Sequence, residues 1–242
     1  EAACRRQFAP PVVRYEQGLA SVNWAERPRL AASFGTASAA ASEGVCADAV
    51  KTGSTALGGA LAVLCDGMGT GKAAAVDGTL AATLAARLLA AGFSGSETAR
   101  MVNTALALRA GGEASATLDA FTADLYSGEA RLYKAGAAPS FLCRAGVVRT
   151  LDGASLPMGV LPTVTGRSTA LTLDVGDTVM MVSDGALCDG SAWLCDQLTL
   201  STRLGQSPQQ TAEAVAASAV RRSGARQDDI TVAIVRLERQ KS

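Results

Sequence analysis

Two aspartates follow apolar runs that are each typical of a buried strand. Asp66 ends the run LAVLCD and precedes Gly67, and Asp184 follows VMMVS and precedes Gly185. A glycine after the acid lets the backbone approach whatever the carboxylate binds. An Asp-Gly pair is also a common turn. Two copies after buried strands, neither followed by a hairpin partner, favour a carboxylate site over two unrelated turns.

Further acids stand at predicted strand boundaries. Asp48 lies in GVCADAV, where we place it at the end of a small-residue strand, and Asp228 and Asp229 precede the apolar run ITVAIV. The chain has no histidine, which excludes Ser-His-Asp and Cys-His nucleophiles and histidine-based zinc helices. Since Mg²⁺ and Mn²⁺ prefer oxygen ligands, these aspartates predict a site for hard divalent cations.

The stretch DGMGTGK after the first acid could instead be a phosphate-binding loop. A Walker loop needs four residues between its glycines and a Ser or Thr after the lysine, whereas Gly67 and Gly71 enclose three residues and an alanine follows Lys72. The spacing from residue 69 fits a permissive dinucleotide fingerprint, but a second predicted helix follows the first, so the strand for a ribose-binding acid is missing. We interpret Lys72 as a solvated or structural side chain and the glycines as serving Asp66.

The segment CRAGVVRT has the spacing of a cysteine-dependent phosphatase loop. Such a loop needs backbone amides at a helix N-terminus to lower the pKa of the thiol. Valines occupy the loop positions here, and we predict a hairpin that turns at Ala145 and Gly146. The six cysteines have no paired short spacings, which indicates reduced thiols and a cytoplasmic setting.

The elements that position these residues follow from periodicity and turn signals. Strands between residues 118 and 183 alternate in hydrophobicity, and Ser127-Gly128 predicts a hairpin turn there. Further strands are predicted at 28–38, 45–50, 60–64 and 230–237. Helices are predicted over 72–91, 95–109 and 209–222. Meandering strands with helices grouped near the first third and the end predict an α+β fold of antiparallel sheets covered by helices.

Length and composition limit the remaining possibilities. The 242 residues, 48% of them hydrophobic, suffice for one large domain. Basic and acidic residues number 22 each, so we expect no nucleic-acid partner. No apolar stretch is predicted to span a bilayer, and we expect no direct membrane contact from this part, whether or not the full-length protein is anchored. The absence of an initiator methionine suggests a soluble piece of a longer protein.

The order of the motifs, an acid followed by DGMGTG, SDG and DDITV, resembles the metal-dependent protein phosphatases of the protein phosphatase 2C superfamily. The segments ATLDAFTADLYSGEARLYKAGAAPSFLCR and SLPMGVL are similar to the phosphatase domain of the stage II sporulation protein E family. The resemblance covers roughly residues 28–237. It implies two stacked antiparallel sheets flanked by helices, with a two-metal Mn²⁺ or Mg²⁺ centre at one end. It also implies serine/threonine phosphatase activity by activation of water.

The resemblance assigns a role to each acid. Asp66 would bridge both metals, and the Gly67 carbonyl would ligate one of them. Asp184 and Asp228 would hold the same or the neighbouring ion, and Asp48 would position a water or a further metal. The metal-binding residues implied are Asp48, Asp66, Gly67, Asp184, Asp228 and Asp229, of which Asp66, Asp184 and Asp228 are implied to be catalytic.

Two positions depart from the family pattern. The family usually has a glycine before the first acid and an aromatic residue soon after, whereas Ala47 precedes Asp48 and no aromatic follows closely. Eukaryotic members place a histidine after the first Asp-Gly, where this chain has Met68, so water would protonate the leaving serine oxygen. The alternative left open is a catalytically impaired domain that acts as a binding or regulatory scaffold.

The resemblance also implies partners and boundaries. The substrate would be a phosphoserine of an anti-anti-sigma factor in bacterial sporulation control. The helices over 72–91 and 95–109 would form a switch and part of a homodimer contact. Residues 1–27 would be an N-terminal segment or linker, and 28–242 the catalytic domain.

Overall fold

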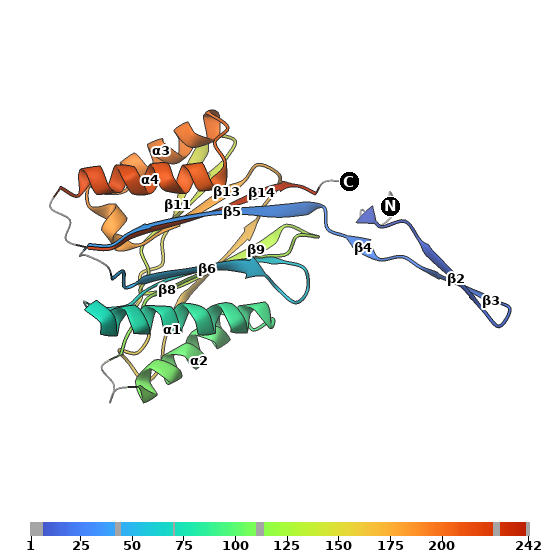
Figure 1. Ribbon diagram of the computed structural model, residues 1–242, viewed down its shortest axis with the longest axis horizontal. Coiled ribbons are helices and arrows are strands. Elements are labelled where there is room, and N and C mark those ends of the chain that lie inside the picture. The colour runs from blue at the N-terminus through green and yellow to red at the C-terminus, as the bar shows by residue number, and fades with distance from the viewer. Residues whose placement is uncertain (1–6, 42–44, 70, 110–113, 225–227, 241–242) are drawn as a thin grey trace.

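The computed structural model describes residues 7–41, 45–69, 71–109, 114–224 and 228–240. Two five-stranded antiparallel sheets lie face to face, with a pair of helices on each outer side (Figure 1). The first sheet, in the order β12-β9-β8-β7-β6, contains β6 (Asp48–Ser54), β7 (Ala60–Asp66), β8 (Leu118–Ala123), β9 (Glu129–Ala135) and β12 (Arg167–Thr172). The second, in the order β11-β10-β13-β14-β5, contains β5 (Leu30–Ala39), β10 (Ser140–Arg144), β11 (Val147–Leu151), β13 (Thr178–Val182) and β14 (Ile230–Arg239). The predicted α+β sandwich is confirmed.

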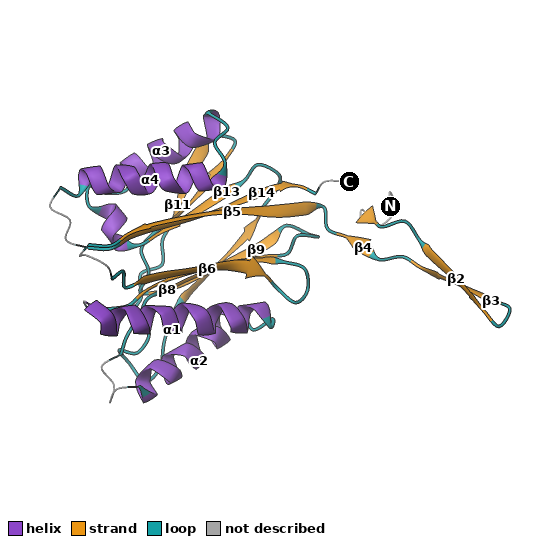
Figure 2. Ribbon diagram, viewed as in Figure 1, coloured by secondary structure: helices purple, strands orange, loops and turns teal. Residues whose placement is uncertain are grey.

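The helices that cover the two sheets are α1 (Gly71–Ala90) and α2 (Gly95–Leu108) on the first sheet and α3 (Ala192–Arg203) and α4 (Pro208–Arg222) on the second (Figure 2). The capping box predicted for α2 is present, with Ser94 and Glu97 each accepting from the other's backbone N–H. The sequence prediction missed α3. Its buried residues include Trp193, Leu194 and Leu198, a helical spacing that the polar residues between them obscured.

Side-chain alternation along β7 divides the core into layers. Leu61, Val63 and Cys65 pack against α1 and α2, whereas Ala62 and Leu64 pack between the two sheets. Because successive residues of a strand point to opposite faces, the last residue of the strand, Asp66, belongs to the inter-sheet series. The acid predicted at this strand end therefore lies at the mouth of the sandwich interior.

Helix α1 is long and apolar enough to cross a membrane by length and composition alone. Its small buried residues, among them Ala81, Ala82 and Ala85, lie in the core cluster between the helices and the first sheet. A Cβ at Gly78 would overlap the carbonyl of Ala47. This close contact identifies α1 as a packed helix of the domain.

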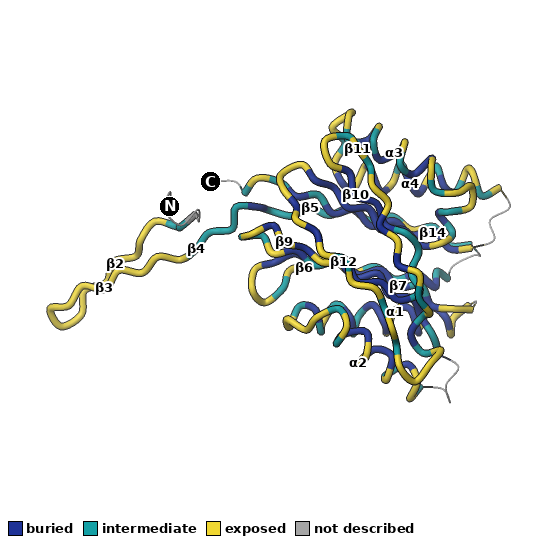
Figure 3. Tube along the Cα trace, turned by 180° about the vertical axis from the view of Figure 1, so that it is seen from behind, coloured by how far each residue is buried: buried dark blue, intermediate teal, exposed yellow. Residues whose placement is uncertain are grey.

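Residues 7–27 form a narrow arm outside both large sheets (Figure 1). Strand β1 (Gln7–Phe8) pairs with β4 (Glu26–Arg27), and β2 (Val12–Glu16) pairs with β3 (Leu19–Asn23). Every residue of β2 and β3 is exposed, and the hairpin projects away from the body (Figure 3). Residues 7–27, which the sequence assigns to an N-terminal segment or linker, thus pair among themselves and outside the two large sheets.

The two alternative phosphate-binding loops are excluded by topology. Cys143 lies in β10, 1% exposed, and β10 turns into β11 through Ala145 and Gly146, both with positive φ. The predicted hairpin is therefore confirmed. Helix α1 leads into α2, and β7 has only antiparallel neighbours, so the parallel βαβ unit of a dinucleotide site is absent from the described sheets.

Candidate metal centre

Strand pairing brings the first two predicted acids together. Asp48 lies opposite Asp66 in the antiparallel pair β6–β7. The prediction that Asp48 ends a strand is wrong, because β6 begins at this residue. In an antiparallel pair the start of one strand lies beside the end of the other, so both carboxylates still reach the same end of the sheet.

The second sheet brings its acids to the same end. Asp184 opens a 3₁₀ turn, η2 (Asp184–Leu187), just after β13, and Asp228 and Asp229 directly precede β14. Because β13 and β14 are antiparallel neighbours, with Val182 opposite Val232, the end of β13 lies beside the start of β14. Four strands thus carry the predicted acids to one end of the sandwich.

Thr117 fixes the backbone of Asp66. The Asp66 N–H donates to Thr117 Oγ1 at 2.9 Å, and the Asp66 carbonyl accepts from the Thr117 N–H at 2.8 Å. Sequence reasoning missed this residue, since a threonine before a strand gives no local sign of a partner 51 positions away.

Asp229 has a bracing role in this structure. Its Oδ1 accepts from the Ala41 N–H and its Oδ2 from the Ala47 N–H, both at 2.6 Å. These bonds fix the backbone at Ala41 and at Ala47, the residue directly before Asp48. Metal ligation by Asp229 stays a prediction, whereas its hold on the backbone is a further role that the sequence did not reveal.

Both Asp-Gly glycines are required by close backbone packing. A Cβ at Gly67 would overlap the carbonyl of Ala74 in α1, and a Cβ at Gly185 would overlap the carbonyl of Asp229. The glycines therefore allow the chain to turn tightly beside the acids. Lys72, in the first turn of α1, is exposed.

Burial and neighbouring negative charges raise the pKa of Asp66 and of Asp184. Burial raises the pKa of Asp66 from 3.8 to about 7, and the charges of Asp48, Asp184, Asp228 and Asp229 add to the rise. A shift that draws on all four other acids indicates that the five carboxylates share one electrostatic environment. Burial and the charge of Asp228 also raise the pKa of Asp184.

Asp48 is deeply buried, with 9% of its surface exposed. Burial raises its pKa to about 6, with smaller contributions from Asp229 and Asp184. The nearby hydroxyls of Ser183 and Thr231 partly offset the rise, but they donate elsewhere, to the Asp229 carbonyl and to Ser38 Oγ. Among the described residues, neither carboxylate oxygen of Asp48 therefore has a partner in hydrogen-bond geometry. A buried carboxylate without a donor is costly unless a cation compensates it.

These observations fit a hard divalent cation. The donors are all oxygens, and a cation would satisfy Asp48 and relieve the repulsion around Asp66. Within the described residues, no three carboxylate or thiol side chains already form a coordinating group, so the carboxylates would have to close around an ion. The residues that would hold it are Asp48, Asp66, Gly67 through its carbonyl, Asp184 and Asp228.

Solved structures share this architecture. The phosphatase domain with a fragment of the regulatory domain of stage II sporulation protein E from Bacillus subtilis matches 98% of this chain and 72% of its own, with TM-score 0.78 and 25% identity. The catalytic domain of the phosphatase PstP, in complex with 2 manganese ions, matches 86% of this chain and 99% of its own, with TM-score 0.68 and 20% identity, which shows the fold alone. The fold and the strand-end acids define a phosphatase domain of the protein phosphatase 2C type.

Within that class, the family model for stage II sporulation protein E matches residues 57–238. The chain belongs to the stage II sporulation protein E family. The curated relative from Bacillus subtilis (strain 168) is 29% identical over 186 residues, covering 73% of this chain and 22% of that protein. The relative from Priestia megaterium is 25% identical over 231 residues, covering 93% and 40%. The chain thus spans less than half the length of either relative.

Proposed function

We propose that this domain is a Mn²⁺- or Mg²⁺-dependent serine/threonine phosphoprotein phosphatase that uses two metal ions. The observation that carries the proposal is the meeting of acids from four strands around Asp66, whose pKa is raised to about 7 by burial and by the other acids. Such a perturbed cluster of carboxylates is typical of a functional site. Membership of a phosphatase family supports the same proposal.

The chain's own residues would hold and orient the reacting groups. When bound, divalent cations lower the pKa of a water toward ~7 and neutralise phosphate charge. Asp66 would help to hold the ions, and Thr117 keeps its backbone in place through two hydrogen bonds. Met68, 47% exposed beside the site, has no dissociable proton, so this position supplies no general acid. Water would then protonate the leaving serine oxygen.

The substrate and partners are proposed from the family. The curated relatives are named as sporulation proteins, and we propose a phosphorylated anti-anti-sigma factor in the cytoplasm as the substrate, with homodimerisation as part of regulation. The balanced charge of 22 basic and 22 acidic residues supports a protein substrate over nucleic acid.

The decisive experiment is metal removal. Hydrolysis of p-nitrophenyl phosphate and of a phosphoserine protein should be abolished by EDTA, restored by Mn²⁺ or Mg²⁺, and insensitive to thiol alkylation. Turnover that persists in EDTA and is lost on alkylation would contradict the proposal and point to a cysteine. A metal-loaded domain that binds the phosphoprotein without hydrolysing it would establish the scaffold alternative.

A further inference from the structure

A buried ion pair lies directly beneath the candidate metal centre. Asp119 of β8 is opposite Lys134 of β9 and, on its other side, opposite Leu64 of β7. Asp66 is the next residue of β7 on the same face as Leu64. The pair therefore occupies the inter-sheet layer one row, or about 7 Å, below the Asp48–Asp66 row.

The Lys134 ammonium joins the two sheets. Its side chain is 2% exposed and that of Asp119 is fully buried. Nζ donates to Asp119 Oδ2 at 2.5 Å, to Ser140 Oγ at 2.8 Å and to the Ala138 carbonyl at 2.6 Å, which uses all three N–H groups. Ser140, the first residue of β10 in the second sheet, also donates to Asp119 Oδ2 at 2.6 Å.

Stability alone does not explain this pair. Replacing a buried ion pair with apolar residues of similar volume is often neutral or stabilising, because desolvating two charges is costly. The neighbouring inter-sheet positions are apolar, including Leu132 and Phe121. What distinguishes the charged pair is its location. Thr117, which is hydrogen-bonded to the N–H and to the carbonyl of Asp66, stands two residues before Asp119.

We propose that Lys134 is a positioning residue for the metal centre, acting through Asp119 and Thr117. Lys134 binds Asp119 to Ser140 of the opposite sheet and so fixes β8 at this depth of the sandwich. With β8 fixed, Thr117 sets the position of Asp66. The inference rests on the proposed function. Partners that orient metal ligands typically account for about 10–100-fold in metal affinity or activity.

The test replaces the pair as a unit with Lys134→Met/Asp119→Leu. Lys134→Met alone would leave Asp119 as an unpaired buried charge and could prevent folding, so the double variant is the informative one. We expect its melting temperature in EDTA to stay near that of the parent protein. Its Mn²⁺ affinity, measured by calorimetry, should fall about 10–100-fold. In the metal-free protein, the amides of Asp66 and Thr117 should exchange with solvent faster.

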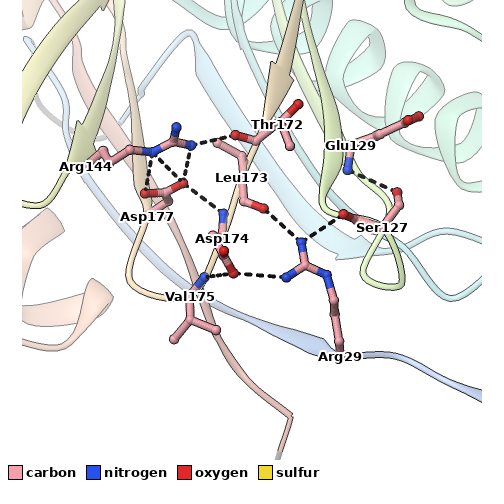
Figure 4. A network of polar contacts seen from close by, with 9 residues as sticks. All are labelled: Arg29, Ser127, Glu129, Arg144, Thr172, Leu173, Asp174, Val175 and Asp177. Carbon is pink, nitrogen blue, oxygen red and sulfur yellow. Dashed lines mark hydrogen bonds and ion pairs between the residues drawn. The ribbon is translucent and has the colours of Figure 1, made fainter. Parts of the chain in front are cut away.

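The matched control is Arg144→Met/Asp177→Leu at the other end of the sandwich, where Arg144 Nε and Nη2 donate to Asp177 at 2.6–3.1 Å (Figure 4). It should leave Mn²⁺ affinity and both amides unchanged. Parent-like affinity and exchange in the Lys134/Asp119 variant, or equal losses in the control, would overturn the proposal. If the parent protein fails to hydrolyse phosphoserine, the proposed function falls, and amide exchange still tests the positioning role.

Discussion

Where β12 passes into β13, two arginines pair with the acids of the connecting loop. Arg29 Nη1 donates to Asp174 Oδ1 at 3.0 Å, and Arg144 pairs with Asp177, whose side chain is 5% exposed (Figure 4). Hydrogen bonds from the Val175 N–H and from Arg29 lower the pKa of Asp174. At the opposite end, burial and mutual repulsion raise the pKa of Asp48 and Asp66.

This contrast separates an end whose acids are paired with arginines of the chain from an end whose acids are not. The loop acids are neutralised by the chain itself, so their charges favour the folded state. Among the described residues, no lysine or arginine forms an ion pair with Asp48, Asp66, Asp184, Asp228 or Asp229. Carboxylates held together without a cation from the chain are typical of a site completed by a ligand.

The largest effect is expected from Asp66→Asn. Losing an anionic ligand at the shared centre should lower Mn²⁺-dependent turnover of p-nitrophenyl phosphate by about 10³-fold or more. The melting temperature in EDTA should hold or rise, because repulsion among the acids is relieved. Asp174→Asn, at a side chain 70% exposed at the other end, is the control and should leave turnover unchanged.

A double variant tests whether Asp66 and Asp184 belong to one metal centre. Since residues that act as one unit are non-additive, Asp66→Asn/Asp184→Asn should be little worse than either single variant. Metal stoichiometry and turnover of the three variants decide this. Independent, multiplicative losses at full metal occupancy would contradict a shared centre.

Gly67→Ala tests the close approach of α1 to the site. A Cβ here overlaps the Ala74 carbonyl, so the helix must shift, at a cost of roughly 2–3 kcal/mol in the free energy of unfolding. Denaturant unfolding measures this cost. Gly53→Ala in β6 is the matched control, because a Cβ there has no heavy atom within 4 Å. Equal stability of the two variants would show that the helix does not constrain the acid loop.

The two ends should respond to pH with opposite signs. In the folded, metal-free protein Asp66 and Asp48 have pKa values of about 7 and 6, against an ordinary value of 3.8. Between about pH 4 and 7 the folded state therefore binds more protons than the unfolded state, and the free energy of unfolding falls as pH rises. The lowered pKa of Asp174 contributes stability that is lost only as pH falls below about 4.

Thermal melts from about pH 5 to 8 check this sign. In EDTA the melting temperature should fall with rising pH, and Asp66→Asn should flatten the slope. In Mn²⁺ the trend should reverse, because metal binds only the deprotonated carboxylates. The same slope in EDTA for the parent and Asp66→Asn would show that Asp66 does not titrate in this range.

The smallest effect is expected from Arg29→Gln. This guanidinium joins Asp174 to the carbonyls of Ser127 and Leu173 at the base of the N-terminal arm. Arg29 is 34% and Asp174 70% exposed, so solvent screens the pair and its loss should cost about 1 kcal/mol or less, equivalent to at most about 2–4 °C. Calorimetry measures the shift, and turnover should not change. A loss of Mn²⁺ affinity in this variant would remove the distinction between the two ends.

The sequence by itself determined the features that depend on local chemistry. Strand-end acids followed by glycine, helix caps and alternating apolar runs each lie within a short stretch of the chain, and the absence of histidine is a matter of composition. They were sufficient for an α+β fold of antiparallel sheets covered by helices, for α1, α2 and α4, and for proposing Asp66, Asp184 and Asp228 as metal ligands. The stacking of two sheets into a sandwich followed from the resemblance to the family. Local patterns determine element type because side-chain periodicity follows directly from backbone geometry.

Only the tertiary structure decided which residues meet. The register that sets Asp48 opposite Asp66, the bonds from Asp229 to Ala41 and Ala47, and the hold of Thr117 on Asp66 join residues 18 to 188 positions apart. The same is true of Lys134. Nothing in the sequence around it indicates a buried ion pair, and only the structure shows that it donates to Asp119 and Ser140. Such pairings depend on strand order and register, which are fixed by the packing of the whole core and leave no periodic signal in the chain.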